Sequence, residues 1–170
     1  DSLARYPTGI FTVLMNKITL PLFYRVEQVK LLGVYAEYLR MVSFIIAPAM
    51  FFLSAFSDVF VSILLTNRWI VSADYLKILA LGYLWEPIGF VSISLLYVKG
   101  DGNGILILEI VKKSLGFVIL LVSLRYGIFY VVLGRSLYSF MSFFINSLFV
   151  SQNYDFSFRK QIQIILPGII

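Results

Sequence analysis

The stretch VSISLLYVKGDGNGILILEI, Val91–Ile110, contains a run of six glycine and polar residues between two apolar runs. The apolar runs extend over residues 78–98 and 105–124. Each is long enough to cross a bilayer as a helix, which needs about 20 mostly apolar residues. The three glycines between them allow a tight reversal of the chain. The stretch therefore predicts two membrane-spanning helices joined by a short turn.

The same stretch contains part of a calcium-binding loop pattern. Asp101, Asn103 and Gly104 fall at the third, fifth and sixth positions of an EF-hand loop. In that register the first ligand position is Lys99 and the twelfth is Ile110, so no bidentate carboxylate closes the loop. The residues therefore predict a helix reversal and argue against a calcium site.

The composition of the whole chain agrees with a membrane protein. Of the 170 residues, 60% are hydrophobic and 14% are charged, and the mean hydropathy is +0.91. Soluble domains average roughly 45–50% apolar and about 25% charged residues. A soluble chain of this length has too little interior to bury so much apolar surface. The sequence therefore predicts a polytopic, all-α membrane helix bundle.

The bundle is expected to hold five complete spans and the start of a sixth. The expected spans cover residues 3–24, 41–65, 78–98, 105–124 and 127–150, with another beginning at 162. The connections between them are short and polar, which favours one bundle over separate domains. The chain starts at Asp1 and stops inside an apolar run, so we expect a fragment of a longer protein.

Loop charges predict the orientation, because short cytoplasmic loops accumulate Lys and Arg. The connections on one side contain Arg25, Lys30, Arg40, Lys99, Lys112, Lys113, Arg159 and Lys160. The opposite side has Arg5, Arg68, Lys77 and Arg125. The first side is therefore expected to be cytoplasmic.

Several predicted helices carry a stripe of polar or small residues at helical spacing. The stripes are Arg5, Thr8, Thr12, Asn16 and Thr19; Ser43, Ala47, Ser54, Asp58 and Ser62; Gly82, Glu86 and Gly89; and Arg135, Ser139, Ser142 and Asn146. For the Ser, Thr and Gly positions the simpler interpretation is close helix packing with interhelical hydrogen bonds.

Charged residues within spans are harder to explain by packing. A charge at the centre of a span costs about 2.5–3.5 kcal/mol on insertion scales, so such residues usually face a cavity or a partner. Lys17 and Asp58 lie near span ends, where the alternative is snorkelling to the interface. Glu86 and Arg135 lie deeper. Prolines 48 and 87 are expected to bend their helices, as in transporters.

Motifs distributed along the chain resemble those of a known superfamily. They lie within Arg5–Val26 and Tyr35–Leu81, and at Pro21–Arg25, Pro48, Asn67–Ala73, Leu76–Leu81, Lys99–Gly100, Glu109 with Lys112 and Lys113, and Ser139–Asn146. In these features the chain resembles bacterial polysaccharide exporters of the multidrug/oligosaccharidyl-lipid/polysaccharide superfamily, which include O-antigen and teichuronic-acid flippases. The resemblance implies that the chain is most of the C-terminal lobe of a two-lobe transporter.

The resemblance also implies a function. A member of this superfamily would move an undecaprenyl-pyrophosphate-linked oligosaccharide across the bacterial cytoplasmic membrane by alternating access. Arg135 is the candidate for the pyrophosphate, and Glu86 for a coupling ion, H⁺ or Na⁺. Asn16, Ser139 and Asn146 are candidates for sugar hydroxyls, while Lys17 and Asp58 complete the candidate lumen. Other polysaccharide assembly proteins are possible partners, and no cofactor or nucleic acid is expected.

Two alternatives remain open at this point. One is an exporter of drugs or of another lipid precursor in the same superfamily. The other is a membrane enzyme of the polysaccharide pathway, which needs a large loop with catalytic residues. No such loop is visible, and the chain has no histidine and no cysteine for a general base or thiolate. The sequence therefore favours a transporter over an enzyme.

Overall fold

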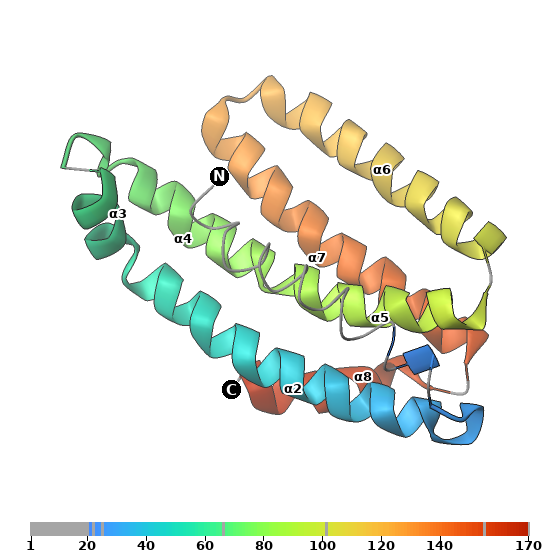
Figure 1. The fold of residues 1–170 in the computed structure, drawn as a ribbon. Coiled ribbons are helices and arrows are strands. Elements are labelled where there is room, and N and C mark those ends of the chain that lie inside the picture. The colour runs from blue at the N-terminus through green and yellow to red at the C-terminus, as the bar shows by residue number, and fades with distance from the viewer. Residues whose placement is uncertain are drawn as a thin grey trace.

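A computed structural model describes residues 21, 23–24, 26–65, 67–100, 102–154 and 156–169. These residues form the helices α2 (Gln28–Ala55), α3 (Ser57–Leu65), η1 (Asn67–Trp69), α4 (Ser72–Tyr83), α5 (Trp85–Lys99), α6 (Gly102–Leu124), α7 (Ile128–Asn153) and α8 (Phe158–Ile169). They contain no strand over the described ranges. The prediction of an all-α helix bundle is confirmed (Figure 1).

Helix α2 begins earlier than the sequence predicted. It starts at Gln28 rather than near residue 41, so the expected polar connection over residues 25–40 is wrong from residue 28 onward. Leu31, Tyr35, Tyr38 and Leu39 are all buried, at the spacing of one helix face. The segment predicted as a polar connection therefore forms the first turns of α2, and its apolar face lies in the core.

Two expected spans are each divided into two helices. The first division is at Phe56, between α2 and α3. The second is at Leu84, between α4 and α5, and it lies three residues before Pro87. Proline has no N–H, so Pro87 removes the intrahelical partner of the Tyr83 carbonyl and weakens the helix there. At Pro48, by contrast, α2 continues as one helix.

The reversal between α5 and α6 occurs where the glycine-rich stretch predicts it. Gly100 ends α5 with φ 75°, in the left-handed region that favours glycine, and its N–H bonds to the Tyr97 carbonyl at 3.1 Å. A second reversal uses Gly127, with φ 101°, between α6 and α7. Because of these two turns, α6 runs antiparallel to both α5 and α7 (Figure 1).

Helix α7 lies at the centre of the bundle. It packs against α4 and α5, α6 and α8, while α2 packs against α4, α5 and α8 (Figure 1). The largest buried cluster includes Tyr35, Met50, Ile88 and Phe143. Outward faces of α2 and α6 are apolar, with exposed residues such as Phe44 and Phe117, as lipid-facing surfaces are.

Three described segments are long and apolar enough to cross a membrane: Lys30–Ala55, Ser72–Val98 and Ile128–Asn153. Helix α6 is also long, but it contains Glu109, Lys112 and Lys113. Lys112 is buried against Glu109 in an ion pair, so it does not belong to an exposed loop as the charge count assumed. The span expected over residues 3–24 lies almost entirely outside the described residues.

Candidate functional site: an ion pair beside an apolar cavity

The break between α4 and α5 brings a carboxylate toward α7. Glu86 is in the first turn of α5. Its Oε1 forms an ion pair with Arg135 of α7 and accepts a hydrogen bond from Nη2 of that residue. The two side chains are 30% and 31% exposed, so neither is fully in solvent nor fully enclosed. An ion pair between helices keeps each charge compensated in an apolar setting.

Ser139 completes this polar cluster. It lies one turn after Arg135 on the same helix and is buried. Arg135 Nη1 donates to Ser139 Oγ at 3.1 Å, and Ser139 Oγ lies 3.4 Å from Glu86 Oε1. Three of the residues that the sequence selected therefore share one site.

Two tyrosines enclose the guanidinium, and the sequence analysis did not select them. Arg135 Cζ lies 4.9 Å from the ring centroid of Tyr83 and 5.4 Å from that of Tyr138. Such cation–π contacts contribute about 0.5–2 kcal/mol each. Both tyrosines lie three positions from a selected charge, Tyr83 before Glu86 and Tyr138 after Arg135. That helical spacing was the signal that could have identified them.

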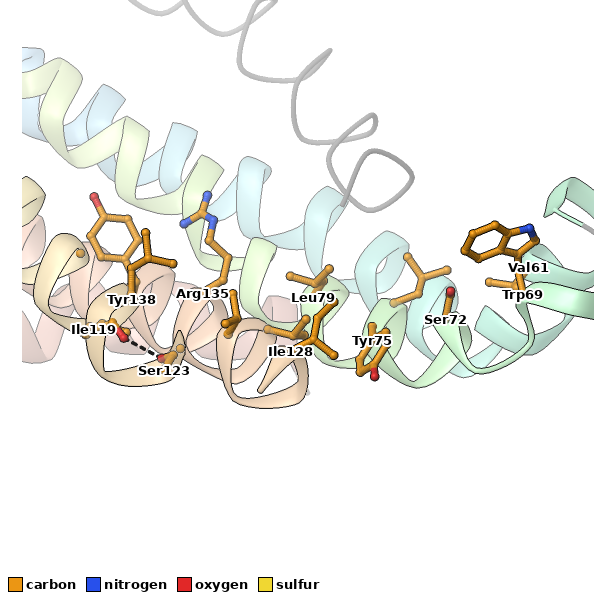
Figure 2. Close-up of a pocket in the computed structure, with 16 residues that line it drawn as sticks. Val61, Trp69, Ser72, Tyr75, Leu79, Ile119, Ser123, Ile128, Arg135 and Tyr138 are labelled. Carbon is orange, nitrogen blue, oxygen red and sulfur yellow. Dashed lines mark hydrogen bonds between the residues drawn. The ribbon is translucent and has the colours of Figure 1, made fainter. Parts of the chain in front are cut away.

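Arg135 also lines a cavity of about 1000 Å³ beside the N-terminal half of α7 (Figure 2). Helix α7 contributes one wall, while α3, η1, α4 and α6 contribute the others. The cavity is lined by Val61, Trp69, Ser72, Tyr75, Leu76, Leu79, Gly116, Ile119, Leu120, Ser123, Ile128, Val131, Val132, Gly134, Arg135 and Tyr138. Among the described residues of this lining Arg135 is the one that carries a charge, and most of the others are apolar.

The remaining selected residues are placed elsewhere or lie outside the described ranges. Asn146 is buried between α5 and α7, where its Nδ2 donates to the Gly89 carbonyl at 3.1 Å. Its Oδ1 has no hydrogen-bond partner among the described residues. Asp58 forms an exposed ion pair with Lys77, with Nζ to Oδ2 at 3.0 Å. Asn16 and Lys17 belong to the residues that the structure does not describe.

A second polar cluster, which the sequence analysis missed, is centred on Gln161 of α8. Gln161 is fully buried, and its Oε1 accepts from the Tyr35 hydroxyl of α2 at 3.0 Å. The same hydroxyl lies 3.0 Å from Ser92 Oγ of α5, and Gln161 Nε2 donates to the Ser147 carbonyl of α7 at 3.1 Å. Tyr35 and Gln161 both fall in segments that read as connections, so neither was expected inside the bundle.

Comparison with known proteins gives one match. Residues 1–74 match the profile of a family described as polysaccharide biosynthesis protein. This is 74 of the 170 residues, and the matched range includes α2, α3 and η1 and ends within α4. The searches of curated proteins and of solved structures returned no match. Over its first 74 residues, the chain is similar to polysaccharide biosynthesis proteins.

Proposed function

We propose that this protein is a transporter that moves undecaprenyl-pyrophosphate-linked oligosaccharide across the bacterial cytoplasmic membrane by alternating access. The observation that carries the proposal is the Glu86–Arg135 pair, which joins two segments long enough to cross a membrane, Ser72–Val98 and Ile128–Asn153, beside a large cavity. The match of residues 1–74 to a polysaccharide biosynthesis family supports a role in making or exporting polysaccharide.

The chemistry of Arg135 suits an anionic substrate. A guanidinium presents paired N–H donors that match phosphate oxygens, and it remains charged at any physiological pH. Glu86 competes for the same donors, because it is already paired with them. A phosphate that binds Arg135 must therefore compete with Glu86, which makes this pair the candidate for coupling transport to an H⁺ or Na⁺ gradient.

The transporter proposal is tested in a bacterial host whose chromosomal copy of the gene has been removed. The intact protein is expected to restore surface polysaccharide. Arg135→Ala is expected to leave the lipid-linked precursor in the inner leaflet, because the pyrophosphate loses its cationic contact. Surface polysaccharide and precursor are both quantified, at expression levels matched by immunoblot.

Arg125→Ala is the matched control, since Arg125 is exposed at the turn between α6 and α7. It removes the same charge outside the candidate site and should restore export like the unchanged protein. Normal surface polysaccharide with Arg135→Ala would contradict the assignment of Arg135. Accumulation of a drug instead of precursor in the deletion host would favour the alternative exporter.

A further inference from the structure

We propose that the cavity on α7 binds the lipid end of the substrate, with a hydrocarbon chain in the cavity and the attached phosphate at Arg135. This inference rests on the proposed function, and it assigns the part of the substrate that binds in the cavity beside Arg135. The ligand class is a single-chain lipid phosphate, such as a polyprenyl or long alkyl phosphate.

The shape of the cavity fits a chain. It extends along α7 from Ile128 to Tyr138, a separation of ten positions, which corresponds to about 15 Å of helix. Its volume of about 1000 Å³ is at the upper end of the roughly 300–1,000 Å³ found for ligand pockets. Its walls are mainly aliphatic, with Leu79 from α4, Leu120 from α6 and Val131 from α7. An elongated apolar space of this kind accommodates a hydrocarbon better than a sugar.

The cavity is placed where a membrane lipid could enter from the side. Helices α4 and α6 both pack against α7 (Figure 1), and residues of all three helices line the cavity. Exposed apolar residues flank it on both walls, with Leu81 on α4 and Val122 on α6. These flanks are lipid-facing surfaces, so the chain needs no passage through water.

Arg135 provides the positive charge that a phosphate in the cavity requires. Among the described residues that line it, Arg135 is the one that carries a charge, Ser123 lies beside its neighbour Gly134, and Ser72 lies toward the opposite end (Figure 2). A guanidinium has five N–H donors. Among the described residues, one donor goes to Ser139 and one to Glu86, while Tyr83 also interacts. Donors therefore remain for a second acceptor.

The position of Glu86 predicts how substitutions at the ion pair change the affinity for a lipid phosphate. The Glu86 carboxylate forms an ion pair with Arg135 but is not part of the cavity lining. It therefore compensates the charge of the guanidinium without entering the cavity. A phosphate at Arg135 must compete with this carboxylate or repel it. Removing the charge of Glu86 should therefore strengthen lipid phosphate binding, and removing Arg135 should weaken it.

The experiment uses a photoreactive long-chain alkyl phosphate with the intact protein in an uncharged detergent, and cross-linked residues are mapped by mass spectrometry. Cross-links are expected on cavity residues such as Leu79, Ile119 and Val131. Arg135→Gln should weaken binding about tenfold, as expected for loss of one charge-assisted contact, and Glu86→Gln should strengthen it. The double variant E86Q/R135Q leaves no unpaired buried charge and should lose the preference for phosphate.

Two neighbouring residues give a matched steric control. Leu120 lines the cavity, whereas Leu121 is similarly exposed, at 50% against 45%, and faces away from it. Leu120→Trp should fill the cavity and abolish labelling at Leu79 and Val131. Leu121→Trp should leave labelling unchanged, because it adds the same bulk on the lipid-facing side.

Several outcomes would overturn the inference. Equal labelling by the matching long-chain alcohol would show that the phosphate is not recognised. Displacement by inorganic phosphate with no chain cross-links would show that only the headgroup binds. Equal losses with Leu120→Trp and Leu121→Trp would remove the cavity as the site. Specific labelling without precursor export in the host would contradict the proposed function but support the lipid site. Normal export without labelling would contradict the lipid site but support the proposed function.

Discussion

At the scale of single residues, the candidate site depends on how Arg135 of α7 is paired. Arg135 and Ser139 are four positions apart, so one face of α7 had to present both. The pairing of Arg135 with Glu86 joins residues 49 positions apart, and no periodicity within one helix predicts it. Asn146 lies on the same face of α7, eleven positions after Arg135, but its Nδ2 donates to the Gly89 carbonyl of α5.

The coupling between Glu86 and Arg135 should be measurable as stability. Glu86→Gln or Arg135→Gln alone leaves a partly buried charge without its partner, so each single variant should cost more than the double variant. A double-mutant cycle is expected to give a coupling energy above about 1 kcal/mol, the upper range of exposed pairs. The measurement is denaturation of the detergent-solubilised intact protein.

The Asp58–Lys77 pair is the control for this cycle, because its side chains are 55% and 38% exposed. Its coupling is expected to be smaller than that of the Glu86–Arg135 pair, because solvent screens exposed charges. If the Glu86 and Arg135 substitutions proved additive, the ion pair would have no role in holding α5 against α7.

At the scale of helices, sequence patterns identified most elements and misplaced some boundaries. The runs over 105–124 and 127–150 correspond to α6 and α7. The beginning of α2 was missed because the polar residues of its first turns obscured the apolar face. Contacts between helices depend on backbone proximity, which a single sequence does not reveal. At Gly82, an added Cβ would lie 2.6 Å from Ser136 Cα of α7.

Gly82→Ala and Gly33→Ala should change stability in opposite directions. At Gly82 the clash is with backbone, so α4 and α7 must separate, at a cost of about 1–3 kcal/mol. Gly33 is exposed within α2 and a Cβ there meets nothing within 4 Å. Alanine at that position should stabilise the protein by about 0.5–1 kcal/mol through helix propensity.

The two substitutions are compared by thermal unfolding under identical detergent conditions. A stabilising effect of Gly82→Ala would show that α4 and α7 are not in close contact in the membrane protein. The serine at 136 adds a second observation at the same place, since its Oγ donates to the Ile78 carbonyl at 2.8 Å.

At the scale of the whole molecule, buried polar groups join helices that are distant in sequence. The Gln161 cluster connects α8 to α2 and α7, and through Tyr35 to Ser92 of α5. Buried hydrogen bonds of this kind fix one arrangement, because any other leaves polar groups unsatisfied. We infer that Gln161 holds α8 in position against the rest of the bundle.

Gln161→Leu should destabilise the protein by about 1–3 kcal/mol, since it removes the buried hydrogen bonds of Gln161 to the Tyr35 hydroxyl and the Ser147 carbonyl. Gln163→Leu is the matched control, because Gln163 is exposed on the same helix. It should be neutral or slightly stabilising in detergent. Equal effects of the two variants on the unfolding midpoint would contradict the role of the cluster.

The orientation of the bundle can be tested by cysteine accessibility. The 170 residues contain no cysteine, so an introduced one is unique within them. Arg125, at the turn between α6 and α7, and Lys160, in the first turn of α8, are both exposed and lie at opposite ends of α7 (Figure 1). With the cytoplasmic side as predicted, Arg125→Cys should react with an impermeant maleimide in intact cells and Lys160→Cys should not. The reverse pattern would invert the proposed topology.

The sequence by itself determined the class of fold, because hydropathy and span length leave few alternatives in a bilayer. It also determined the α5–α6 reversal, where Gly100 adopts a backbone conformation that favours glycine. Only the tertiary structure decided which polar residues meet. Glu86 pairs with Arg135, Gln161 bonds to Tyr35, and Asp58 remains at the surface with Lys77. Helical periodicity fixes the face of a residue, whereas the neighbour of that face depends on how separate helices pack.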